Sequence, residues 1–422
     1  MREQGHGFRG WRPRPPSNGA PSSFALALLI VLLTPALANA VKPGDLDRSF
    51  GKDGRVKAAT YASANALRIG GRGRIVLAGG SFHMVRYWPS GALDRSFGDD
   101  GFASTAFPPP AEGYVSGYAR SMAIDSQRRI VLAGSQCYYE DSDHYELTGC
   151  EIALTRHNPD GSTDESFGDG GTLEDGCPGS CYGESVAIDS QDRIVLASSN
   201  GNRSTLTRYD VDGNVDGSFG DGGQVTTRFF VASVAIDSEG RIVAAGDNGG
   251  VFGVARFESD GELDDSFGSG GITTTEFGRG GGASEVALRP GGRIVAAGGS
   301  DGRFALVRYR PNGKLDHSFS RDGKLTTSFG PRHHDRATAT SVAVDSRGRV
   351  VAAGGAFKLA RYKRNGGLDP TFGKEGKVVS SFGHGYHGGA RDAAIDSQDR
   401  IYVAGGHTHF LLARFIGYPR HR

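Results

Sequence analysis

The sequence predicts an all-β fold, a seven-bladed β-propeller of four-stranded antiparallel blades. Three observations predict it. One unit of about 54 residues repeats seven times between residues 41 and 422. Each copy holds apolar, β-branched segments separated by turns such as Asn-Gly and Asp-Gly. The chain also starts and stops part-way through a unit, which suits a ring closed by its own ends.

Residues 1–40 precede the repeats and are predicted to be a secretory signal peptide. Arginines come first, followed by the apolar run 24–33 and an Ala-x-Ala ending at Ala40. The apolar run is too short to cross a bilayer, which needs about 20 residues. We therefore expect residues 41–422 to form one propeller that is secreted or held at the cell surface, with no membrane span in the mature chain.

Each repeat divides into four predicted strands, which we name A to D. In the fourth copy they cover 233–236, 241–245, 252–257 and 272–277. Strands A and B are almost continuously apolar, with Ala alternating with Val or Ile. This pattern is typical of sheets that are buried on both faces, as in stacked blades.

The two ends of the chain favour a ring over a linear solenoid. Residues 45–60 contain a D strand with no A, B or C before it, and residues 391–415 contain A, B and C with no D after them. The first segment can therefore complete the last blade and leave no unpaired sheet edge. A solenoid would instead need atypical capping repeats.

Residues that recur in all seven copies are predicted to be structural, because one active site cannot use seven copies of a residue. We expect each strand-C arginine to form a buried ion pair or backbone clamp once per blade. The repeated phenylalanine of the link is expected to plug the rim of each blade. The arginines are Arg86, Arg156, Arg208, Arg256, Arg308, Arg361 and Arg414. The aspartates are Asp47, Asp94, Asp164, Asp216, Asp264, Asp316 and Asp369.

Two phrases carry a resemblance to a known family. Leu46 to Gly51 reads Leu-Asp-Arg-Ser-Phe-Gly, and Arg74 to Gly79 reads Arg-Ile-Val-Leu-Ala-Gly; both recur in every copy. The chain resembles the delta-60 repeat family over all seven copies. The resemblance implies a β-propeller and a bacterial secreted or surface location, and it implies no activity. Ser320, in place of a Gly, is one departure from the pattern.

Loop sequences predict that one face of the propeller carries the function. The A–B and C–D turns are short and uniform, whereas the D–A and B–C loops on the other face are irregular. Tyrosines gather there on blades one to three and suit sugar rings or peptides. The alternative is a loop that packs on itself. The candidate ligand-binding tyrosines are Tyr114, Tyr118, Tyr138, Tyr139 and Tyr145.

Unrepeated charges near the start of strand A are predicted to surround the tunnel mouth. They are Arg120, Glu184, Glu285, Arg391 and Asp392. Glu285 and Asp392 stand where four blades have Ser. Two carboxylates around one funnel suit acid–base chemistry, with ordinary solvated rim charges as the alternative.

Metal sites are a further hypothesis, although we expect no cofactor. Histidines from three neighbouring loops would suit zinc or copper, and His407 and His409 can share one face of a strand. The run 210–216 has oxygen ligands at alternating positions, as calcium loops do. Solvated loops and ordinary Asp-Gly turns are the alternatives. The histidines are His333, His334, His384, His387, His407 and His409.

All four cysteines lie on the irregular face and are predicted to form disulfides. Pairing within each loop gives Cys137–Cys150 and Cys177–Cys181. A zinc site of four thiolates is the alternative.

Charge and motif content limit the function classes. Lys and Arg number 48 and Asp and Glu 47, so the sequence predicts no nucleic-acid partner. We expect a secreted, monomeric, non-catalytic binding or scaffold protein for an extracellular glycan, peptide or protein. The alternatives are an extracellular enzyme, glycan-acting or metal-dependent, and a structural surface protein. Trp88 is the one Trp after residue 40, which disfavours sialidase-like and quinone-dependent propellers.

Overall fold

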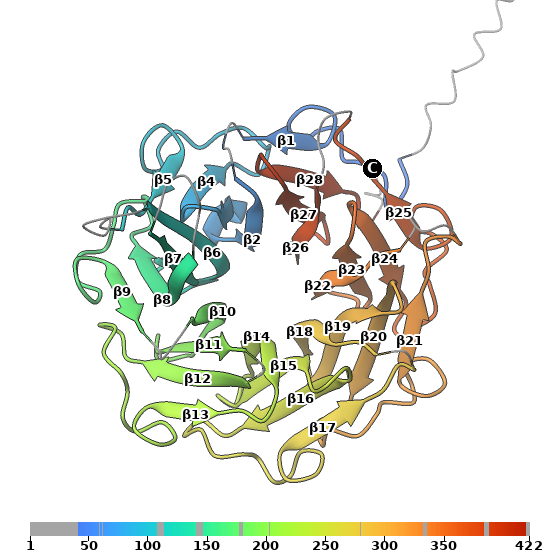
Figure 1. Ribbon diagram of the computed structural model, residues 1–422. Helices are drawn as coiled ribbons and strands as arrows, with labels where there is room; N and C mark the ends of the chain where they lie inside the picture. Colours follow the sequence, from blue (N-terminus) through green and yellow to red (C-terminus); the bar gives the residue numbers. More distant parts are fainter. Residues whose placement is uncertain are drawn as a thin grey trace, which may run out of the picture. The chain divides into compact units, whose positions relative to one another are not determined.

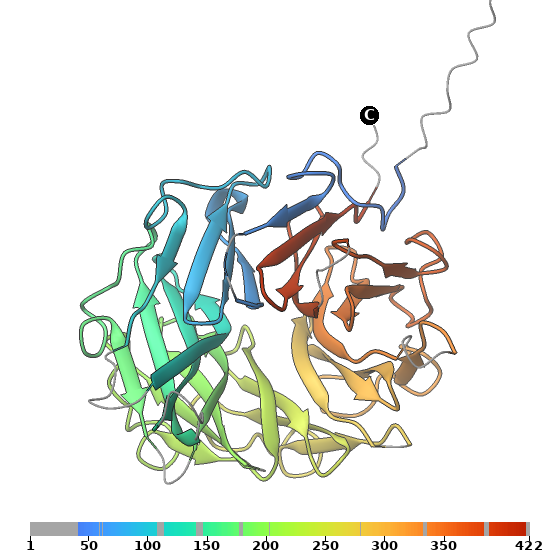
Figure 2. The ribbon, with the colours of Figure 1, turned by 45° about the horizontal axis from the view of Figure 1, so that its top comes forward.

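The computed structural model describes residues 41–418 apart from 59, 61, 108–113, 141–146, 177–179, 202, 279, 332–335 and 384–387, and describes Tyr114 by its backbone alone. In this part of the chain, 28 strands form seven four-stranded antiparallel sheets. The sheets follow one another around a ring in Figures 1 and 2. The predicted seven-bladed propeller is confirmed. The predicted signal peptide lies outside the described residues and stays a prediction.

Blades one to three use the strands β2 to β13, ordered from the axis outward as A, B, C and D. Blade one is β2 (Ala64–Ile69), β3 (Ile75–Gly79), β4 (His83–Tyr87) and β5 (Phe102–Ser104), with the short 3-10 turn η1 (Gly71–Gly73). Blade two is β6 (Tyr114–Ile124), β7 (Ile130–Tyr139), β8 (Leu147–His157) and β9 (Thr172–Asp175). Blade three is β10 (Tyr182–Ile188), β11 (Ile194–Asn200), β12 (Arg203–Tyr209) and β13 (Gln224–Thr226).

Blades four to seven repeat the same order. Blade four is β14 (Phe230–Ile236), β15 (Ile242–Asp247), β16 (Phe252–Phe257) and β17 (Ile272–Thr275). Blade five is β18 (Ala283–Arg289), β19 (Arg293–Ser300), β20 (Arg303–Tyr309) and β21 (Lys324–Thr327). Blade six is β22 (Ala339–Val344), β23 (Val350–Gly354), β24 (Lys358–Tyr362) and β25 (Lys377–Val379). Blade seven is β26 (Gly389–Ile395), β27 (Ile401–Gly406), β28 (Leu411–Phe415) and β1 (Arg55–Lys57).

Blade seven closes the ring by joining the two ends of the chain. Strand β1 pairs antiparallel with β28, with Arg55 opposite Ala413, and the two strands lie side by side in Figure 1. Just upstream, the Gly44 N–H donates to the Ile416 carbonyl at 2.7 Å. The predicted closure by the N-terminal strand is therefore confirmed.

The core is divided among the seven seams between neighbouring blades. Between blades four and five, Val243 and Ala245 of β15 pack with Ile294 and Ala296 of β19, and all four are buried. The B strands are thus buried on both faces, as their sequence pattern predicted. Each fully buried Val or Ile contributes about 1.5–3 kcal/mol.

The strand-C arginine holds each seam together on the face of the A–B and C–D turns. Arg308 Nε donates to Asp316 Oδ2 at 2.9 Å, and its Nη2 donates to Ser318 Oγ at 2.8 Å. Its Nη1 donates to the Arg364 carbonyl, which belongs to the C–D turn of the next blade, at 2.7 Å. The Arg308 guanidinium carbon lies 4.7 Å from the centroid of the Phe319 ring. The arginine thus makes both of the interactions predicted as alternatives, an ion pair and a backbone clamp.

All seven blades repeat this clamp. The carbonyls that accept from the next blade belong to Pro159, Val211, Ser259, Pro311, Arg364, Gly417 and Pro89. The phenylalanines, all fully buried, are Phe50, Phe97, Phe167, Phe219, Phe267, Phe319 and Phe372. Burial alone would raise the pKa of Asp316, but hydrogen bonds from Ser318 and the Arg308 charge lower it to about 2. The clamp aspartate is therefore ionised under ordinary conditions.

A second bond crosses each seam beside the clamp. The Gly268 N–H donates to the Asn312 carbonyl at 3.0 Å, with a φ of +62° at Gly268. Ser320 occupies the equivalent place in the next blade, with a φ of +56° and an N–H that donates to the Asn365 carbonyl at 2.7 Å. The one departure from Gly therefore keeps the bond, in a conformation that Gly adopts at lower cost.

No helix in the described part of the chain is long and apolar enough to span a membrane.

Candidate functional site

Blade two is larger than the other six. Strands β6, β7 and β8 have 11, 10 and 11 residues, whereas the A, B and C strands of the other blades have five to eight. The additional residues lie at the end of the blade where the D–A and B–C loops emerge, which we call the loop face. We call residues 114–118, 135–139 and 147–151 the blade-two extension.

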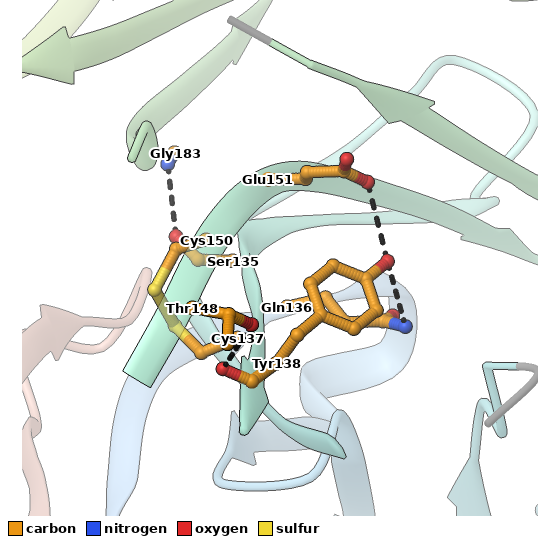
Figure 3. The surroundings of a disulfide bond; sticks show 8 residues. All are labelled: Ser135, Gln136, Cys137, Tyr138, Thr148, Cys150, Glu151 and Gly183. Atoms are coloured by element: carbon orange, nitrogen blue, oxygen red, sulfur yellow. Dashed lines mark hydrogen bonds between the residues drawn. A yellow bond between two sulfur atoms is a disulfide. The ribbon is translucent and has the colours of Figure 1, made fainter. Parts of the chain in front are cut away.

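A disulfide fixes this extension. Cys137 of β7 and Cys150 of β8 face each other in the strand register and are bonded, as Figure 3 shows. Blade three contributes two hydrogen bonds, from the Gly183 N–H to Ser135 Oγ at 3.2 Å and from the Cys181 N–H to the Cys150 carbonyl at 2.9 Å. The extension is therefore held against its neighbour as well as within its own hairpin.

Of the two cysteines in the second predicted disulfide, only Cys181 lies among the described residues. Cys181 is disulfide-bonded. Cys177 lies outside the described residues, so the pairing Cys177–Cys181 stays a prediction.

Tyr138 lies on the side of the extension that faces blade one. Its hydroxyl donates to Glu151 Oε2 at 3.2 Å and accepts from Gln136 Nε2 at 3.3 Å (Figure 3). Burial, followed by the negative charges of Glu174 and Glu151, raises the pKa of Tyr138 to about 12. The tyrosine is thus a neutral hydrogen-bonding group with a half-exposed ring.

The predicted tyrosine patch is divided between two sides of the extension. Tyr118 of β6 lies opposite Ser135 of β7, on the side of the extension toward blade three, and burial raises its pKa. Tyr139 is half-buried. The side chain of Tyr114 and all of Tyr145 lie outside the described residues. Tyr138 and Tyr118 therefore cannot contact the same face of one small ligand.

The inner strands meet around the axis through a repeated serine contact. Each A strand has a β-bulge, and the residue after it points to the next blade. For example, the Val186 N–H donates to Ser121 Oγ at 3.1 Å. Ser185, Ser233 and Ser341 repeat this contact.

Glu285 and Asp392 take the place of this serine in blades five and seven. The Val342 N–H donates to Glu285 Oε2, and the Leu67 N–H donates to Asp392 Oδ2 at 2.8 Å. Ser341 Oγ donates to Asp392 Oδ1 at 3.1 Å. Burial, and then the Asp392 charge, raise the pKa of Glu285. The two predicted tunnel carboxylates thus hold neighbouring blades together.

Arg68 completes this group and was not predicted from the sequence. Its Nη1 lies 2.9 Å from Asp392 Oδ2 and also donates to the Leu67 carbonyl at 2.7 Å. The signal was available, because the other six blades have alanine at this position. The alanines are Ala123, Ala187, Ala235, Ala287, Ala343 and Ala394.

The remaining predicted tunnel charges lie on blades two, three and seven. Arg120 Nη1 lies 2.8 Å from Glu184 Oε2, and Ser199 Oγ donates to Glu184 Oε1 at 2.8 Å. Burial raises the pKa of Glu184 although Arg120 opposes the shift. Arg391 is exposed. The structure thus pairs Glu184 with Arg120, separately from the group around Asp392.

The described residues do not support the predicted metal sites. They contain no group of three or more His, Cys, Asp or Glu arranged to hold a metal ion. The prediction that His407 and His409 share a strand face is wrong, because both lie in the bend between β27 and β28. The other four candidate histidines lie outside the described residues. Asp210 accepts from the N–H groups of Asp212 and Asn214, each at 2.9 Å, as in an ordinary Asx turn.

Comparisons with known proteins support the fold. Residues 73–97, 238–267 and 290–319 match the model of a β-propeller domain of unknown function, DUF5122. No curated protein sequence matches the chain. The structure titled "YCF48 bound to D1 peptide" has a TM-score of 0.51 at 12% identity, covering 88% of this chain and 97% of its own.

Two further solved propellers are similar in part. The WD40 β-propeller domain of Doa1 has a TM-score of 0.49 at 12% identity, covering 85% of this chain and 94% of its own. The Dos1 propeller has a TM-score of 0.48 at 8% identity, covering 86% and 95%. The family-model match shows that part of the repeat sequence is similar to a β-propeller family with no named function.

Proposed function

We propose that this protein is a secreted, non-catalytic binding protein that holds a peptide or glycan against the blade-two extension. One observation carries the proposal. A single blade departs from the repeat by lengthening three strands, and a disulfide fixes the added part. Such a rigid surface loses little conformational entropy when a ligand binds.

Two further features support this reading. Tyr138 offers a half-exposed ring with a polar tip, a combination enriched at interaction hot spots. At the tunnel mouth, Glu285 and Asp392 accept hydrogen bonds from backbone amides of the neighbouring blade, so they serve the ring. The YCF48 structure, of similar fold, carries a bound peptide by its title. The disulfides suit an oxidising compartment outside the cytosol.

The test compares two exposed aromatic residues on opposite faces. Peptide and glycan arrays are probed with the wild-type chain, Tyr138→Ala and Trp88→Ala. Trp88 is 37% exposed and lies in a C–D turn, away from the loop face. We expect Tyr138→Ala to weaken binding at least about tenfold, the cost of losing one aromatic hot spot. We expect Trp88→Ala to leave binding unchanged. Equal binding by all three proteins, or no retained ligand, would refute the proposal.

A further inference from the structure

The blade-one side of the extension gathers hydrogen-bond acceptors. Glu151 of β8 and Glu174 of β9 lie on the same side of the sheet as Tyr138, with Gln136 opposite Glu151 in the register. The Tyr138 hydroxyl bonds to both Gln136 and Glu151 (Figure 3). Three of these four side chains therefore form a connected polar group, and Glu174 lies close enough to affect the pKa of Tyr138. We call these four residues the acceptor cluster.

Neither carboxylate of the cluster has a cationic partner in the part of the chain that the structure describes. Within the described ranges, neither Glu151 nor Glu174 lies within ion-pair distance of an Arg, Lys or His. The clamp aspartates and Glu184, by contrast, are each paired with an arginine. Burial and the Glu151 charge raise the pKa of Glu174, which shows that the two negative charges repel each other. A cation between them would relieve this repulsion.

Gln136 supplies an independent sign of a missing donor. Its side chain is completely buried, and its Nε2 donates to the Tyr138 hydroxyl. Its Oε1 accepts no hydrogen bond from the described residues. A buried acceptor without a donor costs about 1–3 kcal/mol, so native structures rarely keep one. Figure 3 places this amide beside the Tyr138 hydroxyl, inside the cluster.

The base of the cluster is apolar. Gly117 of β6 lies opposite Gln136, and a Cβ on Gly117 would lie 3.3 Å from the ring of Phe82. Phe82 packs edge-on against Phe107, with ring centroids 5.0 Å apart. The cluster thus combines carboxylates, an amide oxygen, a tyrosine ring and an apolar base. An arginine side chain has matching parts, since it presents five planar donors on an apolar stem and stacks on aromatic rings.

We propose that the acceptor cluster binds a basic side chain, arginine before lysine, of a peptide partner. The inference rests on the proposed function and narrows its ligand to a cationic peptide. The guanidinium would lie between Glu151 and Glu174, against the Tyr138 ring. Charge-assisted hydrogen bonds of this kind are about twice as strong as neutral ones.

The experiment uses two peptides that differ only in charge. A Gly-Arg-Gly-Arg-Gly peptide and its Gln counterpart are titrated into the full chain by calorimetry at low and high salt. We expect the Arg peptide to bind at least tenfold more tightly than the Gln peptide. We also expect Glu151→Gln to remove most of this preference, because the substitution removes charge and little volume. Glu276→Gln is the matched control, an exposed glutamate just after β17 of blade four, and should change nothing.

Other outcomes separate this inference from the proposed function. Array ligands that are lost with Tyr138→Ala, yet contain no basic group and ignore Glu151→Gln, would overturn the cationic site and leave the binding function standing. Equal affinities of the Arg and Gln peptides for the full chain would also overturn the cationic site. Tight binding of calcium alone, abolished by Glu151→Gln and blocking the Arg peptide, would replace the peptide cation with a metal. Thermal unfolding of each variant confirms that the ring is intact.

Discussion

The blade seams and the blade-two extension are built from the same antiparallel strands but treat charge in opposite ways. At the seam between blades five and six, Arg308 donates to a carboxylate, a hydroxyl and the next blade's carbonyl, so its charge is compensated inside the ring. In the acceptor cluster, neither Glu151 nor Glu174 has a cationic partner among the described residues, and the buried Gln136 Oε1 accepts no hydrogen bond from them. A group present seven times supports the fold, whereas a group present once is where a ligand is to be sought.

The strongest way to break the ring is to remove its closing strand. A chain that starts at residue 62 lacks β1 and leaves β28 as an open edge. We expect it to lose cooperative unfolding in urea and to aggregate. A circular permutant in which residues 41–61 follow residue 418 restores an ordinary fourth strand. It should unfold with the midpoint of the wild type. A truncated chain that unfolds like the wild type would contradict the closure.

The next largest effect is expected at a single clamp. Arg308→Met removes the buried partner of Asp316 and leaves this carboxylate only the half-exposed Arg293, whose Nε lies 3.2 Å from Asp316 Oδ2. The loss should cost at most about 3–5 kcal/mol of unfolding free energy, the range for breaking a buried ion pair. Urea unfolding followed by circular dichroism measures this change. Arg310→Met alters an exposed arginine two residues away and should stay within about 0.5 kcal/mol of the wild type. Equal losses of unfolding free energy in the two variants would show that the clamp does not stabilise the seam.

Removing the extension's disulfide should affect stability locally. The double substitution of Cys137 and Cys150 by Ser opens a loop with a sequence separation of 13. Such a loop corresponds to about 3 kcal/mol in the chain-entropy model. We expect faster amide hydrogen exchange at residues 135–139 and 147–151, with the exchange of the seams unchanged. Loss of protection throughout the ring would mean that the extension supports the fold and is not an addition to it.

The smallest effect concerns pH at the axis. The pKa of Glu285 is raised in the folded chain, so the folded state holds its proton more tightly than the unfolded state. Its contribution to stability is complete below the unfolded value of 4.5 and is lost as the pH rises through the folded pKa. Glu285→Ser restores the residue of four other blades, and Glu285→Gln mimics the protonated acid. Urea unfolding midpoints, measured as the pH is raised from 4.5 to about 8, should decrease in the wild type and decrease less in both variants.

Sequence reasoning identified the repeated parts because repetition marks them. Seven copies of Arg, Asp and Phe at one spacing predicted a structural ion pair or backbone clamp in each blade, and the unmatched ends predicted a ring. That the clamp crosses to the next blade was seen only in the structure. Arg68 could have been found by the same rule, as the one departure from alanine.

The sides of the extension could not be predicted. A bulge in β6 lies beside Tyr118, and one extra residue reverses the face to which a side chain points. The sequence therefore suggested one tyrosine patch where the structure has two sides. Nor does composition show that Glu151 and Gln136 are opposite each other, because this depends on the register of β7 and β8.

The pairing of β1 with β28 in blade seven also determines the order in which the blades can be completed during folding. Ser49 accepts a hydrogen bond from Arg414, a residue 365 positions later in the chain. During synthesis the first strand must therefore wait, without its partner, until the last strand exists. Six blades can stack in order while that early segment is kept from pairing elsewhere. The slow step in folding should be the final docking of the two ends, because it joins residues that are far apart in the sequence.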